Sequence, residues 1–247
     1  MVGIIGATGF IGSALTEQLQ GISITRENYN QHRGSHFDIL INANGNSKKY
    51  LADKDPLQEF TASVGSLSQF VRDFSYNLFV LISSCDVYEQ MIPEMSREEI
   101  SINPTYVSQY GYHKLIAEQI IHGFCPSFLI IRLGGCVGKN MWKNPIYDII
   151  TRKQLFIHPA SSLQYLHVDK MAEIVSNLCK DSHRGTFNVC GKRTEVLQDM
   201  LNIDDVKWNE ELPKIVYDIN IDKISCLYEI PTTYKTITDF AKQRGKL

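Results

Sequence analysis

Three side chains in the middle of the sequence have the types and the spacing needed for proton transfer. Ser84 follows an apolar run at residues 78–83, and Tyr110 and Lys114 are four residues apart in a stretch with helical spacing. Residues at i and i+4 lie on one helix face, so the Lys114 ammonium is expected beside the Tyr110 phenol. A free tyrosine has a pKa of about 10, and a nearby positive charge favours the phenolate. We therefore expect Lys114 to lower the pKa of Tyr110 toward the neutral range, where it is a useful proton shuttle.

The glycines near the N-terminus predict a cofactor beside these side chains. An apolar run of strand type at residues 1–5 precedes Gly6, Gly9 and Gly12, and residues 13–20 have helical spacing. Gly6 permits a tight turn, Gly9 lets the backbone approach a pyrophosphate, and Gly12 lets the helix pack closely on the strand. A strand, turn and helix without a ligand need only one or two glycines. A dinucleotide beside the serine, tyrosine and lysine predicts hydride transfer to or from a carbinol.

Length, charge and cysteine spacing limit the class of protein. The chain has 247 residues, which suits one α/β domain or a core lobe with a small appended lobe. The formal net charge is −2 with both signs interspersed, so we expect no nucleic-acid surface and no basic membrane tail. No apolar run approaches the roughly 20 residues that span a bilayer, and the first strand leaves no room for a signal peptide. The six cysteines form no C-x-x-C pair. We expect a cytoplasmic protein without disulfides or zinc.

Alternating apolar runs and helical stretches predict the fold class. Unbroken apolar runs typical of strands buried on both faces occur at residues 22–25, 37–42, 78–83, 128–132 and 187–189. Helical spacing occurs at residues 56–74, 106–124, 145–152 and 169–180. This order predicts an α/β fold, a Rossmann-like doubly wound parallel sheet with a small C-terminal substrate lobe.

The division of the chain into lobes follows from the same pattern. Residues 21–42 leave room for a short strand but no full helix, so one edge of the sheet is expected to be trimmed. The chain after residue 191 is more polar, with a strand expected at 215–219 and a helix starting near Pro231. We expect one domain over residues 1–247, with the Rossmann-like lobe at about 1–133 plus 160–190 and the substrate lobe at about 134–159 plus 191–247. The basic pair Lys48-Lys49 is expected in a solvated loop.

Several motifs in a fixed order resemble those of the extended short-chain dehydrogenases/reductases, the NAD-dependent epimerase/dehydratase family. The resemblance covers nearly the whole chain. Its carriers are the glycine loop, Asn42-Ala43-Asn44-Gly45, Ser84 four residues before Tyr88, Tyr110-x-x-x-Lys114 followed by Leu115, Ala117 and Glu118, Arg132-Leu133-Gly134, His167-Val168-Asp169, and Phe187-Asn188-Val189. A tyrosine and lysine at this spacing alone are a frequent accident, but here they follow a strand end that carries a serine.

The resemblance implies roles for individual residues. Ser84, Tyr110 and Lys114 would be catalytic, and Lys114 would also hold the nicotinamide ribose. The implied cofactor-binding residues are Gly6, Thr8, Gly9, Phe10, Ile11, Gly12, Arg26, Asn42, Ala43, Asn44, Ser83, Tyr110 and Lys114. The implied substrate residues are Cys85, Asp86 and Gly134. The partner would be a small molecule, a nucleotide sugar, and a homodimer is compatible with the resemblance.

The chain departs from the pattern of this family at four places. Where an acidic residue would bind a free ribose 2′-hydroxyl, the chain has Thr25-Arg26, and a guanidinium suits a 2′-phosphate better. NADP(H) is therefore favoured over NAD(H). The D-x-x motif that usually ends the third strand has no clear counterpart, which fits a trimmed edge. The motif P-Y-x-x-S-K reads Gln109-Tyr110-Gly111-Tyr112-His113-Lys114, with His113 in the place of the serine. Leu163 stands where relatives carry an arginine that helps bind the nucleotide of the sugar donor.

Three activities and one binding role compete. A dehydratase would show Thr-Asp-Glu at positions 84–86, whereas the chain has Ser84-Cys85-Asp86 with one carboxylate. Cys85 is read equally as a small packed residue or as an acid. Arg26 favours a 4-keto-sugar reductase that exchanges NADP(H) over a 4-epimerase that keeps its NAD. A non-catalytic, dinucleotide-sensing protein would have lost the serine, tyrosine and lysine. We expect an NAD(P)-dependent oxidoreductase that acts on a nucleotide-linked sugar.

Overall fold

A six-stranded sheet forms the centre of the fold in the computed structural model, which describes residues 1–46, 49–151 and 154–245. The strand order is β2-β1-β3-β4-β5-β9. The pairs β1–β2, β1–β3, β3–β4 and β4–β5 are parallel. The strands are β1 (Val2–Ile5), β2 (Ile22–Ile24), β3 (His36–Asn42), β4 (Ser75–Ser84), β5 (Phe128–Leu133) and β9 (Gly185–Val189). The Rossmann-like fold class predicted from the sequence is confirmed.

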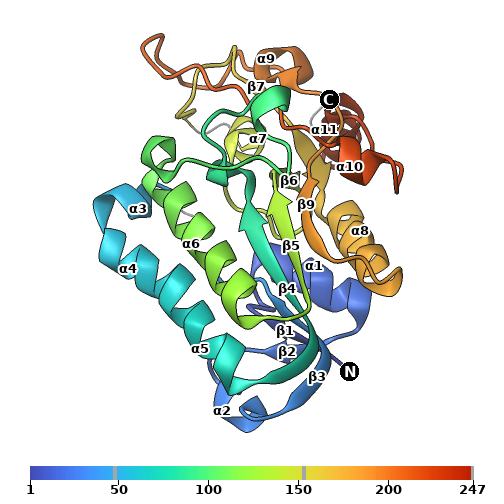
Figure 1. The fold of residues 1–247 in the computed structure, drawn as a ribbon. Coiled ribbons are helices and arrows are strands. Elements are labelled where there is room, and N and C mark those ends of the chain that lie inside the picture. The colour runs from blue at the N-terminus through green and yellow to red at the C-terminus, as the bar shows by residue number, and fades with distance from the viewer. Residues whose placement is uncertain (47–48, 152–153, 246–247) are drawn as a thin grey trace. The chain divides into compact units, whose positions relative to one another are not determined.

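Helices cover both faces of this sheet. Figure 1 shows α4 (Pro56–Phe60), α5 (Ser66–Asp73) and α6 (Gln109–Phe124) on one face and α1 (Phe10–Leu19) on the other. A π-helical turn, η1 (Thr61–Gly65), joins α4 to α5. Apolar side chains of the sheet, α5 and α6 form one buried cluster that includes Phe37, Phe79, Leu67 and Ile121. This cluster holds α6, which carries two of the predicted catalytic residues, against the strands.

The sheet ends at β2, so its edge is trimmed as the spacing predicted. Only the single-turn helix α2 (Tyr29–His32) separates β2 from β3. The Asn28 side chain braces the turn after β2, because its oxygen accepts from the Thr25 N–H at 2.7 Å and its nitrogen donates to the Ser23 carbonyl at 2.9 Å. This turn carries Thr25 and Arg26 at the carboxyl end of the edge strand.

The chain divides into two compact units. The first contains Met1–Glu89, Glu98–Leu133 and Ala172–Phe187, and the second contains Gln90–Arg97, Gly134–Met171 and Asn188–Leu247. In the second unit, β6 (Gly135–Val137) pairs in parallel with β8 (Tyr165–His167), and β7 (Ser162–Leu163) pairs antiparallel with β10 (Glu195–Val196). The remaining elements are α3 (Tyr50–Lys54), η2 (Cys85–Val87), η3 (Pro93–Met95), η4 (Pro104–Tyr106), α7 (Pro145–Ile150), α8 (Val168–Lys180), α9 (Leu197–Met200), α10 (Asp222–Ser225) and α11 (Thr233–Gln243).

Several predicted elements differ from the structure in their bounds, and the helix expected at 56–74 is divided into α4, η1 and α5. The strand expected at 215–219 is reduced to a bridge between Ser162 and Val216, because the carboxamide of Gln164 binds both the N–H and the carbonyl of Ile219 in place of a neighbouring strand. The helix expected at 106–124 begins at Gln109, since the Ser108 hydroxyl caps it by accepting from the Gly111 N–H at 3.1 Å. The helix expected at 145–152 ends at residue 150, and residues 152 and 153 lie outside the described residues.

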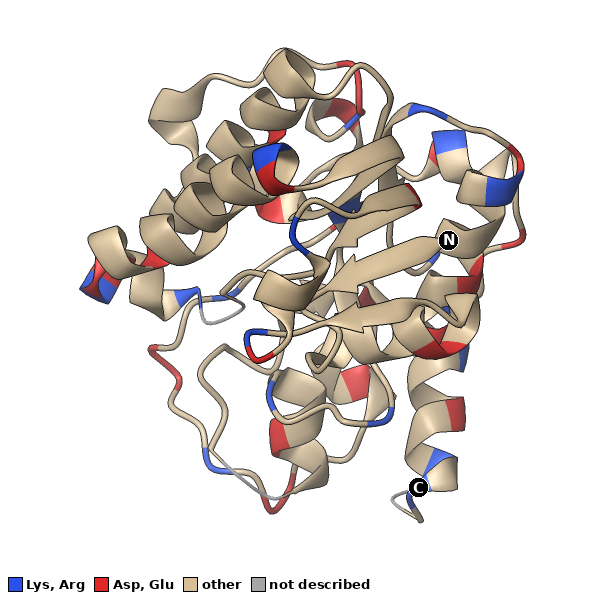
Figure 2. Cartoon of the chain, turned by 90° about the horizontal axis from the view of Figure 1, so that it is seen from below, with Lys and Arg blue, Asp and Glu red and all other residues tan. Residues whose placement is uncertain are grey.

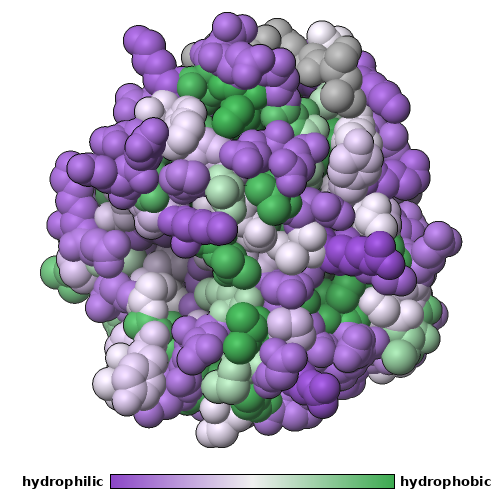
Figure 3. All heavy atoms as spheres, turned by 90° about the horizontal axis from the view of Figure 1, so that it is seen from above, coloured by the Kyte–Doolittle hydropathy of each residue, from purple (hydrophilic) through white to green (hydrophobic). Residues whose placement is uncertain are grey.

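Charges and apolar side chains are distributed without a single dominant patch in the views shown. Figure 2 shows acidic and basic residues interspersed along the helices and loops, with few on the strands. On the face drawn in Figure 3, hydrophobic residues form small areas between hydrophilic ones. No helix within the described residues is long and apolar enough to cross a membrane.

Candidate active site

At two of the three glycine positions in the loop between β1 and α1, any larger residue would clash with the backbone. Gly6 has a φ of +80°, and a Cβ there would lie 2.7 Å from the Asn44 backbone nitrogen. A Cβ on Gly12 would lie 2.1 Å from the Gly6 carbonyl oxygen, closer than atoms can approach. Gly9 is the N-cap of α1 and has no side chain to bind the free N–H groups of the first turn. The helix therefore presents unpaired donors and the positive end of its dipole to the loop.

A pocket of ≈ 920 Å³ lies beside this loop in the first unit. Its size is within the range of small-molecule sites. Of the residues predicted to bind a cofactor, it is lined by Gly6, Thr8, Gly9, Arg26, Ala43 and Asn44. These residues follow the carboxyl ends of β1, β2 and β3, where ligands bind in open parallel sheets. Further lining residues that the sequence did not indicate include Tyr29, Asn30, Gln58, Glu59, Gln69 and Phe70.

Four further predicted cofactor residues lie at the start of α1 or at the ends of strands, outside the pocket lining. Phe10 and Ile11 open helix α1, and the Ser13 N–H donates to the Gly9 carbonyl at 2.8 Å. The buried Asn42 side chain accepts from the Asn44 N–H at 3.0 Å. Ser83 is buried, and its hydroxyl donates to Glu118 at 2.6 Å.

Ser83 and Ser84 point to opposite sides because successive side chains alternate along a strand. The Ser84 hydroxyl donates to the Asp86 carboxylate at 2.7 Å, and Ser84 and Asp86 both influence the pKa of Tyr110. Lys49 binds both oxygens of Asp86, at 2.8 and 2.7 Å. Lys49 lies in a turn before α3 and its side chain is 54% exposed, so the expected solvated position is confirmed for Lys49, while Lys48 lies outside the described residues.

Tyr110 and Lys114 lie on one face of α6 as the spacing predicted. The Lys114 Nζ atom is 5.6 Å from the centre of the Tyr110 ring, and both side chains are buried. Burial raises the pKa of Tyr110 above its usual value, and the Asp86 carboxylate raises it further. The expected shift of this pKa toward the neutral range is wrong, because burial outweighs the opposing effect of the Lys49 charge. Burial also lowers the pKa of Lys114, against the opposing effect of nearby carboxylates.

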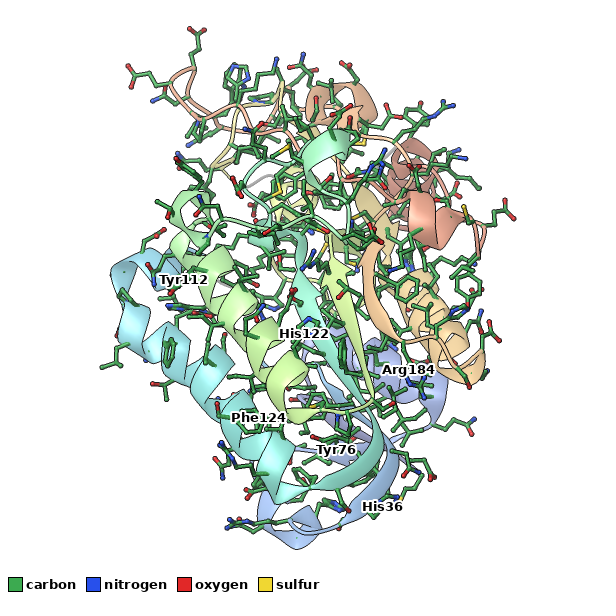
Figure 4. The ribbon with its side chains drawn as sticks, in the orientation of Figure 1. His36, Tyr76, Tyr112, His122, Phe124 and Arg184 are labelled. Atoms are coloured by element: carbon green, nitrogen blue, oxygen red, sulfur yellow. The ribbon has the colours of Figure 1, made fainter. Side chains whose placement is uncertain are left out.

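Of the three predicted catalytic residues, Lys114 lies next to the pocket through Gly45. A Cβ on Gly45, which lines the pocket, would lie 3.1 Å from Lys114 Nζ and 3.8 Å from Ser63 Oγ. In Figure 4, Tyr112 marks the first turn of α6, while His122 and Phe124 mark its other end. Tyr110 and Lys114 therefore belong to the half of α6 that packs near the carboxyl ends of the strands.

The three residues predicted to contact a substrate each have different hydrogen-bond partners in the structure. Asp86 is the carboxylate that binds Ser84, as described above. Cys85 is 1% exposed and its thiol donates to the Arg132 carbonyl at 3.2 Å, which favours the packed residue of its two readings. Gly134 belongs to the second unit, where its N–H donates to the Val189 carbonyl at 3.1 Å.

Two buried pairs of polar side chains near the site were not predicted from the sequence. Glu59 of α4 contacts His113 of α6, and both side chains are almost fully enclosed. Both carboxylate oxygens of Glu118 accept from the Arg132 guanidinium behind the strand that carries Ser84, at 2.7 Å in the shortest contact. Glu118 and Arg132 belong to quoted motifs, but their pairing follows only from the packing of α6 on β5.

Comparisons with known proteins identify the fold. No protein-family model matches the sequence, and no curated protein matches it. A crystal structure of UDP-galactose 4-epimerase superposes with a TM-score of 0.76 at 18% identity, covering 99% of this chain and 98% of that chain. The UDP-glucuronic acid 4-epimerase of Bacillus cereus, in complex with UDP-glucuronic acid and NAD, gives a TM-score of 0.76 at 18% identity, covering 98% of this chain and 99% of that chain.

A reductase is equally similar. The dTDP-4-dehydrorhamnose reductase of Bacillus anthracis, in complex with NADP, has a TM-score of 0.77 at 16% identity, covering 98% of each chain. The chain therefore has, along almost its whole length, the fold of the nucleotide-sugar epimerases and reductases that its motifs resemble.

Proposed function

We propose that the chain is an NAD(P)-dependent oxidoreductase of the extended short-chain dehydrogenase/reductase type, and that it reduces a nucleotide-linked 4-keto sugar. One observation carries this proposal. Ser84, Tyr110 and Lys114 come from two elements into one buried region, and Lys114 lies next to Gly45, which lines the pocket at the glycine loop. A protein that only senses a dinucleotide has no use for a buried serine, tyrosine and lysine beside its pocket.

The residues present fit a dinucleotide. The uncapped start of α1 and the close approach allowed by Gly9 suit a pyrophosphate, and the Lys114 ammonium suits the hydroxyls of the nicotinamide ribose. Arg26 is exposed at the edge of the pocket and suits a 2′-phosphate. A bound reduced nicotinamide would supply the hydride.

The side chains of this chain would then manage the proton and the carbonyl oxygen. Tyr110 holds a proton that a carbonyl oxygen takes up as its carbon accepts hydride, which makes the tyrosine the general acid. Ser84 positions the oxygen, and Asp86 orients the Ser84 hydroxyl. Lys114 provides a positive charge that stabilises the tyrosinate left behind.

One observation favours a reductase over an epimerase. Arg26 favours NADP(H), which a reductase exchanges in every turnover. An epimerase with tightly bound NAD is the second candidate, because both classes occur among the similar structures, one with NAD and one with NADP.

The substrate class rests on the fold and on the neighbours. UDP-glucose and UDP-glucuronic acid are bound in similar structures of MoeE5, at 13% identity. We propose a nucleoside-diphosphate sugar for this chain on that ground. Leu163, buried at 7% exposure, replaces the arginine that the family resemblance led us to expect, so the nucleotide contact would differ from that of its relatives.

The deciding experiment measures bound cofactor and turnover on the same preparation. The purified protein is denatured and the released nucleotide is identified, and a second sample is given NADPH with a nucleoside-diphosphate 4-keto-6-deoxyhexose. A reductase arrives empty and oxidises NADPH with this substrate. Stoichiometric NAD released from the protein, with interconversion of UDP-hexose epimers, would replace the reductase proposal with the epimerase.

A further inference from the structure

The turn of α6 that carries Tyr110 and Lys114 contains two departures from the family motif that touch each other. Gln109 and His113 stand in the places of the proline and the serine of P-Y-x-x-S-K. The side-chain nitrogen of Gln109 lies 2.7 Å from Nε2 of His113. The amide N–H can only donate, so Nε2 accepts and the imidazole proton is on Nδ1.

The other ring nitrogen of His113 contacts a buried carboxylate. Nδ1 donates to Oε2 of Glu59, and the second oxygen of Glu59 accepts from the Ser63 hydroxyl at 2.5 Å. Glu59 is 1% exposed, and its two partners here are the His113 imidazole and the Ser63 hydroxyl. These hydrogen bonds fix the position of the carboxylate.

Lys114 is the cation beside this carboxylate. A Cβ added to Gly45 would lie 3.1 Å from Lys114 Nζ and 3.8 Å from Ser63 Oγ, so both atoms are close to the same position. Because Ser63 binds Glu59 directly, the carboxylate and the ammonium share one buried region at the border of the pocket. Both lie in the first unit.

Two other carboxylates raise the pKa of Lys114, and each of them forms an ion pair with a different cation. Asp86 of η2 is bound by Lys49, and Glu118 of α6 is bound by Arg132. Glu59 has the largest effect of the three carboxylates on the pKa of Lys114, and each of them raises it. Burial acts in the opposite direction and is stronger, so the charge of the lysine depends on these neighbours.

We propose that Glu59 is a positioning residue whose buried carboxylate, fixed by His113 and Ser63, is the counter-charge that holds the Lys114 ammonium beside Tyr110. The role of Lys114 in turnover rests on the proposed function. The effect of the Glu59 charge on Lys114 does not, and it can be measured without cofactor or substrate.

The test follows the titration of Lys114 by NMR, with lysine labelled with carbon-13 at Cε and the resonance assigned by its loss in Lys114→Met. Glu59→Gln removes the charge and keeps the shape, so the midpoint is expected to fall by about one pH unit. Ser63→Ala is the matched control, because it removes a hydrogen bond to the same carboxylate and leaves the charge. It is expected to leave the midpoint in place. An unchanged midpoint in folded Glu59→Gln overturns the proposal.

A second variant covers the case in which Glu59→Gln does not fold. Glu59→Asp keeps the charge but withdraws it from the lysine by one methylene, so the midpoint is expected to fall by a fraction of a pH unit. A lowered melting temperature with no shift of the midpoint in Glu59→Asp would assign Glu59 a structural role only. In the active enzyme, the alkaline limb of kcat/KM should move with the midpoint. A parent that binds dinucleotide but reduces no keto sugar would refute the proposed function and leave the NMR result valid.

Discussion

Tyr110 and Tyr112 form a natural pair for separating chemistry from packing at the scale of the residue. Both are on α6, but Tyr110 is 9% exposed, whereas Tyr112 is 40% exposed. Tyr110→Phe is expected to lower kcat by roughly 10²- to 10⁴-fold with little change in cofactor affinity, because it removes the proton donor and keeps the ring. Tyr112→Phe should leave both values unchanged. Stopped-flow reduction and a cofactor titration measure them, and equal rates for the two variants would remove Tyr110 from the mechanism.

Arg26 tests cofactor choice at the same scale. A 2′-phosphate adds close to two negative charges, and a guanidinium at the pocket edge binds it strongly. NADP(H) is expected to bind more tightly than NAD(H), and Arg26→Ala should remove most of that difference while barely changing NAD(H) affinity. Arg72→Ala is the control, because Arg72 is on α5 and stacks on Phe124 away from the pocket. Calorimetric titration of both cofactors decides the matter, and a parent that prefers NAD(H) would shift the proposal to the epimerase.

The strand, turn and helix at the N-terminus depend on Gly12 at the scale of the element. A Cβ on Gly12 would overlap the Gly6 carbonyl, whereas a Cβ on Gly123 of α6 meets no atom within 4 Å. Gly12→Ala is therefore expected to separate α1 from β1, with loss of cofactor binding and a lower melting temperature. Gly123→Ala should stabilise the protein by about 0.5–1 kcal/mol, since alanine is the better helix former. Thermal unfolding of both variants checks this, and a Gly12→Ala protein as stable as the parent would contradict the close packing.

Sequence patterns located the elements well and their ends less well. The strands at 37–42 and 128–132 were predicted to within one residue at each end, because buried parallel strands are unbroken apolar runs. The strand at 215–219 was wrong because a side chain, Gln164, takes the place of a partner strand, and sequence spacing cannot indicate that. Motif order predicted that Ser84, Tyr110 and Lys114 lie near one another, and in the structure all three are buried, with Lys114 Nζ 5.6 Å from the Tyr110 ring centre.

Charge balance inside the site could not be predicted from spacing. The i, i+4 rule placed Lys114 beside Tyr110 but gave no measure of burial, and burial reversed the expected direction of the Tyr110 pKa. Glu59 is over fifty residues from Lys114 in the sequence. Its place beside the lysine depends on the packing of α4 and η1 against α6, which no local pattern records.

At the scale of the whole chain, the two units should respond differently to cofactor alone. Every described residue that lines the pocket belongs to the first unit. A ligand at a hundred times its dissociation constant stabilises the state that binds it by about 2.7 kcal/mol. Local unfolding events that release the ligand become less frequent by the corresponding factor, about a hundredfold. NADP(H) is therefore expected to slow amide hydrogen exchange at residues 6–12, 24–27 and 43–46 and to leave residues 195–217 of the second unit unchanged. Hydrogen exchange with mass spectrometry, with and without cofactor, measures both segments. Equal protection of 195–217 would mean that the cofactor site extends beyond the residues assigned here, and protection confined to 195–217 would refute the pocket as the cofactor site.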